Sequence, residues 1–151
     1  MIERVLSGGQ TGVDRAALDA ARTAKIEIGG WCPRARRAED GAISEQYPLR
    51  ETPSAGYAQR TEWNVRDADG TLILNREALE GGTALTARVA SRWGKPCLTI
   101  DLENPPSTKV VVDWFAEKNI RVVNVAGPRE AQRPGIYAQA LKFLRAVFGA
   151  I

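Results

Sequence analysis

Short apolar runs alternate with stretches of helical periodicity along the whole chain. The runs IERVLS, GTLILN, CLTIDL and IRVVNVAG are typical of buried strands, and IEIGGW is a weaker example of the same pattern. Between these runs, apolar or small residues recur every three or four positions, as in 13–24 and 57–67. Strands that alternate with helices favour parallel βαβ units. The sequence therefore predicts an α/β fold, a three-layer α/β/α sandwich around a mostly parallel sheet.

Several residues predict where the helices begin and end. Thr83 and Ser107 are candidate N-caps, because a hydroxyl there can accept a hydrogen bond from an amide of the first turn. Pro134 suits the first position of the last helix, where the missing N–H of proline is not needed. Gly149 would end that helix.

Composition and charge narrow the class of protein. We expect residues 1–151 to form a single domain, because no linker or internal repeat is visible and 44% of the residues are hydrophobic. The net charge of +3 fits an anionic ligand. The basic residues are scattered rather than gathered in a stripe or tail, which argues against nucleic acid as a partner. No apolar run approaches the length of a membrane span, so we expect no membrane contact.

The sequence offers no obvious metal site and no export signal. It contains no histidine, which removes the commonest general base and metal ligand. Cys32 and Cys97 lie far apart and form no metal-binding motif, so we expect no metal site. The N-terminal MIERVLSGGQ lacks the charged and apolar regions of a signal peptide. We therefore expect a cytoplasmic protein with reduced thiols.

Three glycine-containing junctions, SGGQTG, GGT and NVAGPR, lie at or near the start of a predicted helix. In parallel sheets such junctions meet beyond the carboxyl ends of the strands, where ligands bind. Free N–H groups at a helix start favour anions, and glycine allows a phosphate to approach the backbone. We predict that these junctions bind a small anionic ligand, most simply one with a phosphate. The residues concerned are Gly8, Gly9, Gln10, Thr11, Gly12, Gly81, Gly82, Thr83, Asn124, Gly127 and Arg129.

The glycine-rich motif GGQTGVD excludes two common classes of protein. It lacks the G-x-G-x-x-G spacing of a dinucleotide-binding fingerprint and the lysine of a P-loop. The chain is therefore neither a typical Rossmann dehydrogenase nor a P-loop NTPase. A purely structural role for each glycine stays open, because glycines also permit tight turns and close packing of a helix on a sheet.

Charged residues near the first junction have two interpretations each. Asp14 could complement the dipole of the first helix or contact a ligand hydroxyl. For Arg15 we favour a solvated side chain. Arg60 and Asn64 form an i, i+4 pair that is either exposed or part of a site. The segment 32–54 has no clean periodicity, and a connection of this length is either a solvated loop or a functional one.

The segments SGGQTGVDRAALDAA, GWCPRARRAEDGAISEQYPLRET, YAQRTEWNVRDADGTLIL and GGTALT together resemble the molybdenum cofactor carrier family, also described as circularly permuted YpsA-like. That family belongs to a Rossmann-like group that includes the lysine-decarboxylase-like LOG proteins. The resemblance implies a Rossmann-like fold and a nucleotide-like or phosphorylated pterin ligand, such as molybdopterin. It adds to the candidate site the residues Arg36, Glu39, Asp40, Arg60, Thr61 and Asn64. Ala35 stands where the family pattern has glycine, and Ser44 where it has proline.

The resemblance leaves two functions open. One is a carrier that binds the molybdenum cofactor or a nucleotide without transforming it. The other is a LOG-type hydrolase that cleaves the bond between ribose and base, which needs a carboxylate and an arginine near the sugar. Glu39, Asp40 or Asp14 could supply the carboxylate, and Arg36 or Arg60 the arginine. Association is common in related proteins, so we also expect a homo-oligomer.

Overall fold

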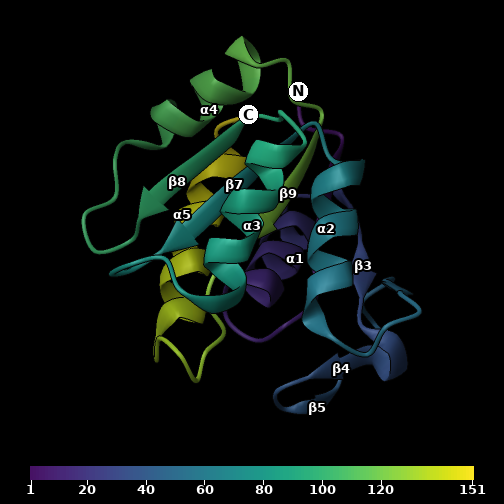
Figure 1. Ribbon diagram of the computed structural model, residues 1–151. Helices are drawn as coiled ribbons and strands as arrows, with labels where there is room; N and C mark the ends of the chain where they lie inside the picture. Colours follow the sequence, from purple (N-terminus) through teal and green to yellow (C-terminus); the bar gives the residue numbers. More distant parts are fainter.

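The computed structural model describes all residues from 1 to 151, and its centre is a five-stranded sheet. Every neighbouring pair of strands is parallel, in the order β2-β1-β9-β7-β8, of which β9, β7 and β8 are labelled in Figure 1. The strands are β1 (Arg4–Leu6), β2 (Glu27–Gly29), β7 (Gly70–Asn75), β8 (Cys97–Asp101) and β9 (Val122–Ala126). All six residues of β7 are buried, as expected for an inner strand with helices on both faces.

Helices cover both faces of the sheet, which confirms the three-layer α/β/α architecture. They are α1 (Val13–Thr23), α2 (Tyr57–Asp67), α3 (Gly81–Arg92), α4 (Thr108–Glu117) and α5 (Ile136–Gly149). One core packs α1, α4 and α5 against strand residues such as Val5, Leu72 and Val123. On the other face α2 and α3 lie side by side (Figure 1) and share a smaller apolar cluster. No helix is both long enough and apolar enough to cross a membrane.

Alanines allow α1 to pack closely on its neighbours. Ala16, Ala17, Ala20 and Ala21 are at most 1% exposed, and they face the sheet and α5 within the main core. Because an alanine side chain is a single methyl group, the helix backbone can approach the adjacent elements. This close contact fixes the position of the β1–α1 turn, which carries the SGGQTG motif.

The segment 32–54, which has no clean periodicity, is an ordered connection between β2 and α2. It contains two pairs of very short strands and one 3-10 turn: β3 (Trp31–Cys32), η1 (Arg34–Arg36), β4 (Arg37–Ala38), β5 (Gly41–Ala42) and β6 (Arg50–Glu51). Ile43, Tyr47 and Leu49 are buried against Leu18 of α1 and form a small core with Cys32. Most residues of this segment are exposed, as the solvated-loop interpretation expects, but its apolar residues pack on α1.

Two of the predicted helix starts were wrong. The Thr83 and Ala84 amides both donate to the Glu80 carbonyl, at 3.1 and 3.2 Å, so α3 begins at Gly81 and Thr83 lies inside its first turn. The last helix begins after Gly135, which is left-handed with φ 89°, rather than at Pro134. The prediction for Ser107 is confirmed, because its hydroxyl accepts from the Lys109 amide at 3.2 Å.

Candidate ligand-binding site

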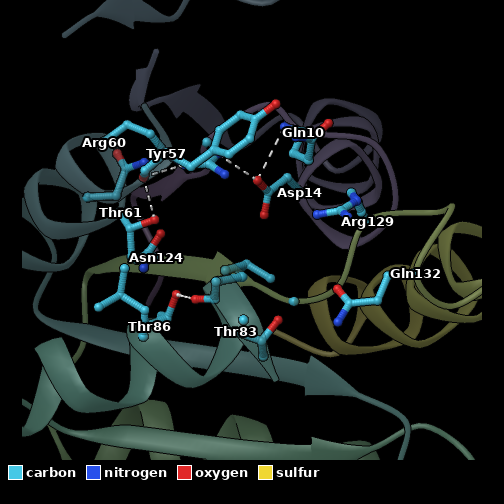
Figure 2. Close-up of a pocket in the computed structure, with 18 of the residues that line it drawn as sticks. Gln10, Asp14, Tyr57, Arg60, Thr61, Thr83, Thr86, Asn124, Arg129 and Gln132 are labelled. Atoms are coloured by element: carbon cyan, nitrogen blue, oxygen red, sulfur yellow. Dashed lines mark hydrogen bonds and ion pairs between the residues drawn. The ribbon is translucent and has the colours of Figure 1, made fainter. Parts of the chain in front are cut away.

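A cavity of about 330 Å³ lies beyond the carboxyl ends of β1 and β9, between α2 and the start of α3. Figure 2 shows polar side chains from α2, from α3 and from the segment after β9 around one shared space. The lining consists of Gly8, Gln10, Asp14, Tyr57, Arg60, Thr61, Asn64, Gly81, Gly82, Thr83, Leu85, Thr86, Arg88, Asn124, Val125, Ala126, Gly127, Arg129 and Gln132. The three glycine junctions, although far apart in sequence, therefore meet at one cavity.

Most of the predicted site residues line this cavity. They are Gly8, Gln10, Asp14, Arg60, Thr61, Asn64, Gly81, Gly82, Thr83, Asn124, Gly127 and Arg129. The structure places the remaining predicted residues outside the lining, and these are Gly9, Thr11, Gly12, Arg36, Glu39 and Asp40. The residues of the second group contact neighbouring segments of the chain instead of lining the cavity.

At four of the glycines a Cβ would overlap other atoms of the protein, and at Gly8 these atoms belong only to the Arg60 side chain. A Cβ on Gly8 would overlap the Arg60 guanidinium, and one on Gly127 would overlap the carbonyl oxygen of Leu74. Similar overlaps would follow at Gly9, with Leu49 and Ile43, and at Gly12, with the Pro128 carbonyl oxygen. These four glycines therefore have a structural role. The atoms that approach their backbone belong to the protein and not to a ligand.

The glycine pair at the start of α3 has a different environment. A Cβ built on Gly81 or on Gly82 meets no heavy atom within 4 Å. The Glu80 side chain at the N-cap makes no capping hydrogen bond, so it does not cover the first amides of the helix. In α1, by contrast, the first amide, of Val13, donates to the Pro128 carbonyl at 3.2 Å. The start of α3 is thus open to an approaching anion, whereas the start of α1 is closed by the chain.

A buried ion pair lies at the α2 side of the cavity. Arg60 Nη1 is 3.2 Å from Asp14 Oδ2, and the two side chains are only 12% and 7% exposed. The same Asp14 oxygen accepts from the Gln10 amide at 3.2 Å. Burial raises the pKa of the Asp14 carboxyl above its usual value, while Arg60 and the Gln10 amide act against that increase. This pair ties α2 to the first turn of α1 (Figure 2).

Other polar residues from α2 are held by backbone contacts. The Asn64 side chain accepts from the Trp31 amide at 2.8 Å and donates to the Trp31 carbonyl at 2.9 Å. The Thr61 hydroxyl donates to the Tyr57 carbonyl at 2.9 Å, within the helix. Asn64 therefore fixes the position of β3 relative to α2, in addition to lining the cavity.

The charge around the cavity is mainly positive. Arg60, Arg88 and Arg129 line it, and Asp14 is the single carboxylate among the lining residues. Figure 2 draws no hydrogen bond from the Thr83 hydroxyl to the other residues shown, although Thr83 is only 5% exposed. Guanidinium groups and hydroxyls are donors that suit carboxylate or phosphate oxygens. The arrangement can therefore bind an anion.

Arg36 and Asp40 hold the 32–54 segment together instead of facing the cavity. The Arg36 guanidinium donates to four carbonyl oxygens of the segment, those of Ile43, Ser44, Tyr47 and Leu49, at 2.8 to 3.1 Å. Asp40 binds both terminal nitrogens of Arg15, at 2.5 and 2.8 Å, and this hydrogen-bonded pair lowers the pKa of Asp40. The expectation of a solvated Arg15 was wrong, since its side chain is only 18% exposed and also donates to the Gly9 carbonyl.

Sequence reasoning missed several lining residues. They are Tyr57, Leu85, Thr86, Arg88, Val125, Ala126 and Gln132. Thr86 could have been found by helical spacing, because it lies one turn after Gly82 and its hydroxyl donates to the Gly82 carbonyl at 2.8 Å. Tyr57 carried no such signal, because it is the first residue of α2 and the sequence does not show that α2 packs beside α3.

Residues 5–148 match the model of the circularly permutated YpsA SLOG family. The chain belongs to this family. It is also similar to a crystal structure, at 1.45 Å resolution, of a protein from Syntrophus aciditrophicus SB that is titled "Putative molybdenum carrier protein". The two share 44% sequence identity with a TM-score of 0.94, over 97% of this chain and 94% of that one. No curated protein matches the chain significantly. These comparisons confirm both the family resemblance and the Rossmann-like fold.

The residues that could bind a metal directly are dispersed. No group of three or more His, Cys, Asp or Glu side chains is arranged to hold a metal ion. Cys32 is fully buried, and burial raises the pKa of its thiol, which keeps it in the unreactive protonated form. The donors around the cavity are thus amides, hydroxyls and guanidinium groups.

Proposed function

We propose that the chain binds a phosphate-bearing small molecule, nucleotide-like or pterin, in the cavity between α2 and α3. The observation that carries this proposal is the open start of α3, where space remains above Gly81 and Gly82. In this proposal the phosphate lies against the first amides of α3. The positive end of the helix dipole favours an anion there by roughly 0.3–1 kcal/mol, or more where the site is partly buried.

Side chains around that position add to the binding of the phosphate. The Thr83 hydroxyl is a donor one residue beyond the glycine pair, and Arg88 follows on the same helix. Arg129 reaches the cavity from the segment after β9 (Figure 2). Each hydrogen bond between a charged donor and the phosphate contributes about 1.5–3 kcal/mol. A phosphate that binds both the α3 amides and Arg129 therefore bridges two of the three glycine junctions.

The rest of the ligand would occupy the cavity toward α2. Its volume of about 330 Å³ is at the lower end of the range for small-molecule sites. Tyr57 supplies an aromatic side chain, and Asn124 and Asp14 supply polar groups that can distinguish one head group from another. A single mononucleotide or a phosphorylated pterin is a ligand of suitable size and polarity.

The molybdenum cofactor is the specific ligand that we favour, because the similar crystal structure carries the name of a molybdenum carrier. In that case the pterin, rather than protein side chains, would hold the metal, in keeping with the amide and guanidinium donors around the cavity. The chain's own residues would bind the phosphate and orient the pterin ring.

A LOG-type hydrolase is the second candidate, and one observation favours it. Asp14 lines the cavity beside Arg60, and its raised pKa would help a carboxyl to act as a proton donor to a leaving base. Glu39 and Asp40, the other carboxylates considered, do not line the cavity, and they pair with Arg129 and Arg15 respectively. If this candidate is correct, Asp14 is the residue that acts on the bond between ribose and base.

Two measurements on the purified protein test the proposed function. Native mass spectrometry of freshly purified protein, followed by denaturation, identifies any small molecule that is retained, and we expect a phosphate-bearing heterocycle. Incubation with AMP, other nucleotides or molybdopterin, followed by chromatography of the products, separates the two candidates. Binding without turnover supports the carrier, whereas release of free base supports the hydrolase. Absence of any binding would contradict both.

A further inference from the structure

Glu39 lies outside the cavity but contacts a residue that lines it. Glu39 Oε1 is 3.0 Å from Arg129 Nε. The other carboxylate oxygen accepts from the Ala131 amide at 3.1 Å and from the Thr11 hydroxyl. One side chain of the 32–54 segment thus contacts both the turn after β1 and the segment after β9.

The position of Glu39 is fixed independently of Arg129. Its own amide donates to Gln10 Oε1 at 2.9 Å, and the same oxygen accepts from the Thr11 amide at 3.1 Å. The Thr11 hydroxyl in turn accepts from the Glu130 amide at 3.1 Å. These hydrogen bonds hold the carboxylate in place from three segments of the chain.

Arg129 is the more exposed member of the pair. Its side chain is 51% exposed, whereas that of Glu39 is 21% exposed. Glu39 is its one ionic partner, and the contact is made through Nε. The terminal nitrogens Nη1 and Nη2 therefore stay available for another anion, and Figure 2 shows the Arg129 side chain beside the cavity.

We propose that Glu39 is a positioning residue, which holds the Arg129 guanidinium beside the cavity so that its terminal nitrogens can bind a ligand phosphate. The effect of Glu39 on ligand binding rests on the proposed function, whereas its contact with Arg129 does not. It assigns a purpose to the 32–54 segment, which brings this carboxylate to the junction between the other two loops. It also explains why an acidic residue lies near an anion site without lining it.

Glu39 could instead compete with the ligand for Arg129, and that role would change the phosphate affinity in the opposite direction. If Glu39 competed with the ligand for Arg129, removal of its charge would strengthen phosphate binding. If Glu39 positions Arg129, removal of its charge weakens binding, because the exposed guanidinium then samples many orientations. The sign of the change in affinity therefore distinguishes the two roles.

The first experiment tests, without any ligand, whether the Glu39 carboxylate lies beside the Arg129 Nε–H group. The variant Glu39→Gln keeps one acceptor oxygen for the Thr11 hydroxyl and the Ala131 amide, and places an uncharged NH2 group instead of the second oxygen beside Arg129. The Arg129 Nε–Hε signal in an NMR spectrum is identified by its loss in Arg129→Ala. The carboxylate 3.0 Å from Nε slows base-catalysed exchange because its charge repels hydroxide, so we expect this proton to exchange with water faster in Glu39→Gln than in the wild type. The control Glu51→Gln removes a charge from the same segment, where Glu51 contacts only the local Ala35 amide, and should leave the exchange rate unchanged.

The second experiment measures binding of inorganic phosphate by titration calorimetry in a double-mutant cycle. We expect Arg129→Ala to weaken binding about tenfold, as for the loss of one charge-assisted hydrogen bond. Glu39→Gln should weaken it severalfold in the wild type and have no effect in the Arg129→Ala background. Glu39→Asp, which draws the carboxylate back by one methylene, should act in the same direction and replaces Glu39→Gln if that variant does not fold.

The outcomes separate this inference from the proposed function. An unchanged exchange rate of the Arg129 proton in Glu39→Gln overturns the positioning role, and so does tighter phosphate binding or an equal loss in both backgrounds. If the wild type does not bind phosphate but the Arg129 proton exchanges faster in Glu39→Gln, the proposed function is overturned. The contact between Glu39 and Arg129 is then still supported.

Discussion

The Arg60 guanidinium lies directly against Gly8, in the space that a side chain at position 8 would occupy. The absence of a side chain there allows Arg60 to reach the buried Asp14 carboxylate at 3.2 Å. The first glycine of the SGGQTG motif is thus explained by an internal ion pair. Arg60 is far from Gly8 and Asp14 in the sequence but contacts both in the structure, so the relationship can be tested by paired substitutions.

We predict that Gly8→Ala destabilises the fold by displacing Arg60 from Asp14. Breaking a buried pair costs about 3–5 kcal/mol, and partial relaxation would reduce that figure. In the background Arg60→Ala the same substitution should cost less than about 1 kcal/mol, since the space is then free and Gly8 does not have a positive φ. Urea unfolding of the four proteins gives the coupling. If Gly8→Ala lowers the free energy of unfolding equally in the wild type and in Arg60→Ala, Arg60 is not the group that excludes a side chain at position 8.

We predict that Ala35→Gly stabilises the protein. Ala35 has φ 66°, in the left-handed region where a Cβ costs roughly 1–2 kcal/mol, and it stands where the family pattern has glycine. The greater freedom of glycine in the unfolded chain offsets part of this gain, so the net effect is about 0.5–1 kcal/mol. The control Ala42→Gly, at an exposed strand position without a positive φ, should instead destabilise. A loss of stability in Ala35→Gly would count against local strain at this turn.

We predict a loss of stability at alkaline pH that depends on two tyrosines. The Tyr47 and Tyr137 hydroxyls both donate to Asp19, and burial together with this hydrogen bond raises the pKa of each phenol from 10.0 to about 12. A raised pKa in the folded state means that the stabilisation is complete below pH 10 and is lost as the pH rises toward 12.

Unfolding by urea between pH 9 and pH 11.5 should therefore show a slope that becomes shallower in Tyr47→Phe and Tyr137→Phe. Tyr57→Phe is the matched control, because Asp19 accepts hydrogen bonds from the Tyr47 and Tyr137 hydroxyls but not from that of Tyr57. If the slopes of all three variants equal that of the wild type, the shared Asp19 does not hold these phenols in their protonated form.

The arrangement of helices and strands was largely predictable from the sequence. The periodicity placed a helix over 57–67 and a strand over 70–75, and α2 and β7 have those same bounds. These elements have apolar faces, and burial of such faces dominates local structure. The error at Thr83 has a different origin, because the helix start depends on which carbonyl the first amides reach.

The candidate site was predictable only in part. The sequence shows that Gly8 and Gly82 are glycines beside helix starts, but it does not show that Arg60 fills the space at Gly8 while the space at Gly82 stays open. That difference arises from contacts between α2 and the β1–α1 turn, which are far apart in sequence. For the same reason the 32–54 segment gave no periodic signal, although its apolar residues pack on α1.

The most direct test of the account is phosphate binding by variants of Gly82. Gly82→Asp and Gly82→Asn place side chains of nearly equal size in open space, and an aspartate in the first turn also favours helix formation. Titration calorimetry with inorganic phosphate and with AMP measures the affinity of each variant. We predict that Gly82→Asp weakens binding at least about tenfold more than Gly82→Asn does, because only aspartate repels the phosphate. Equal affinities of the two variants would contradict the claim that the start of α3 binds an anion.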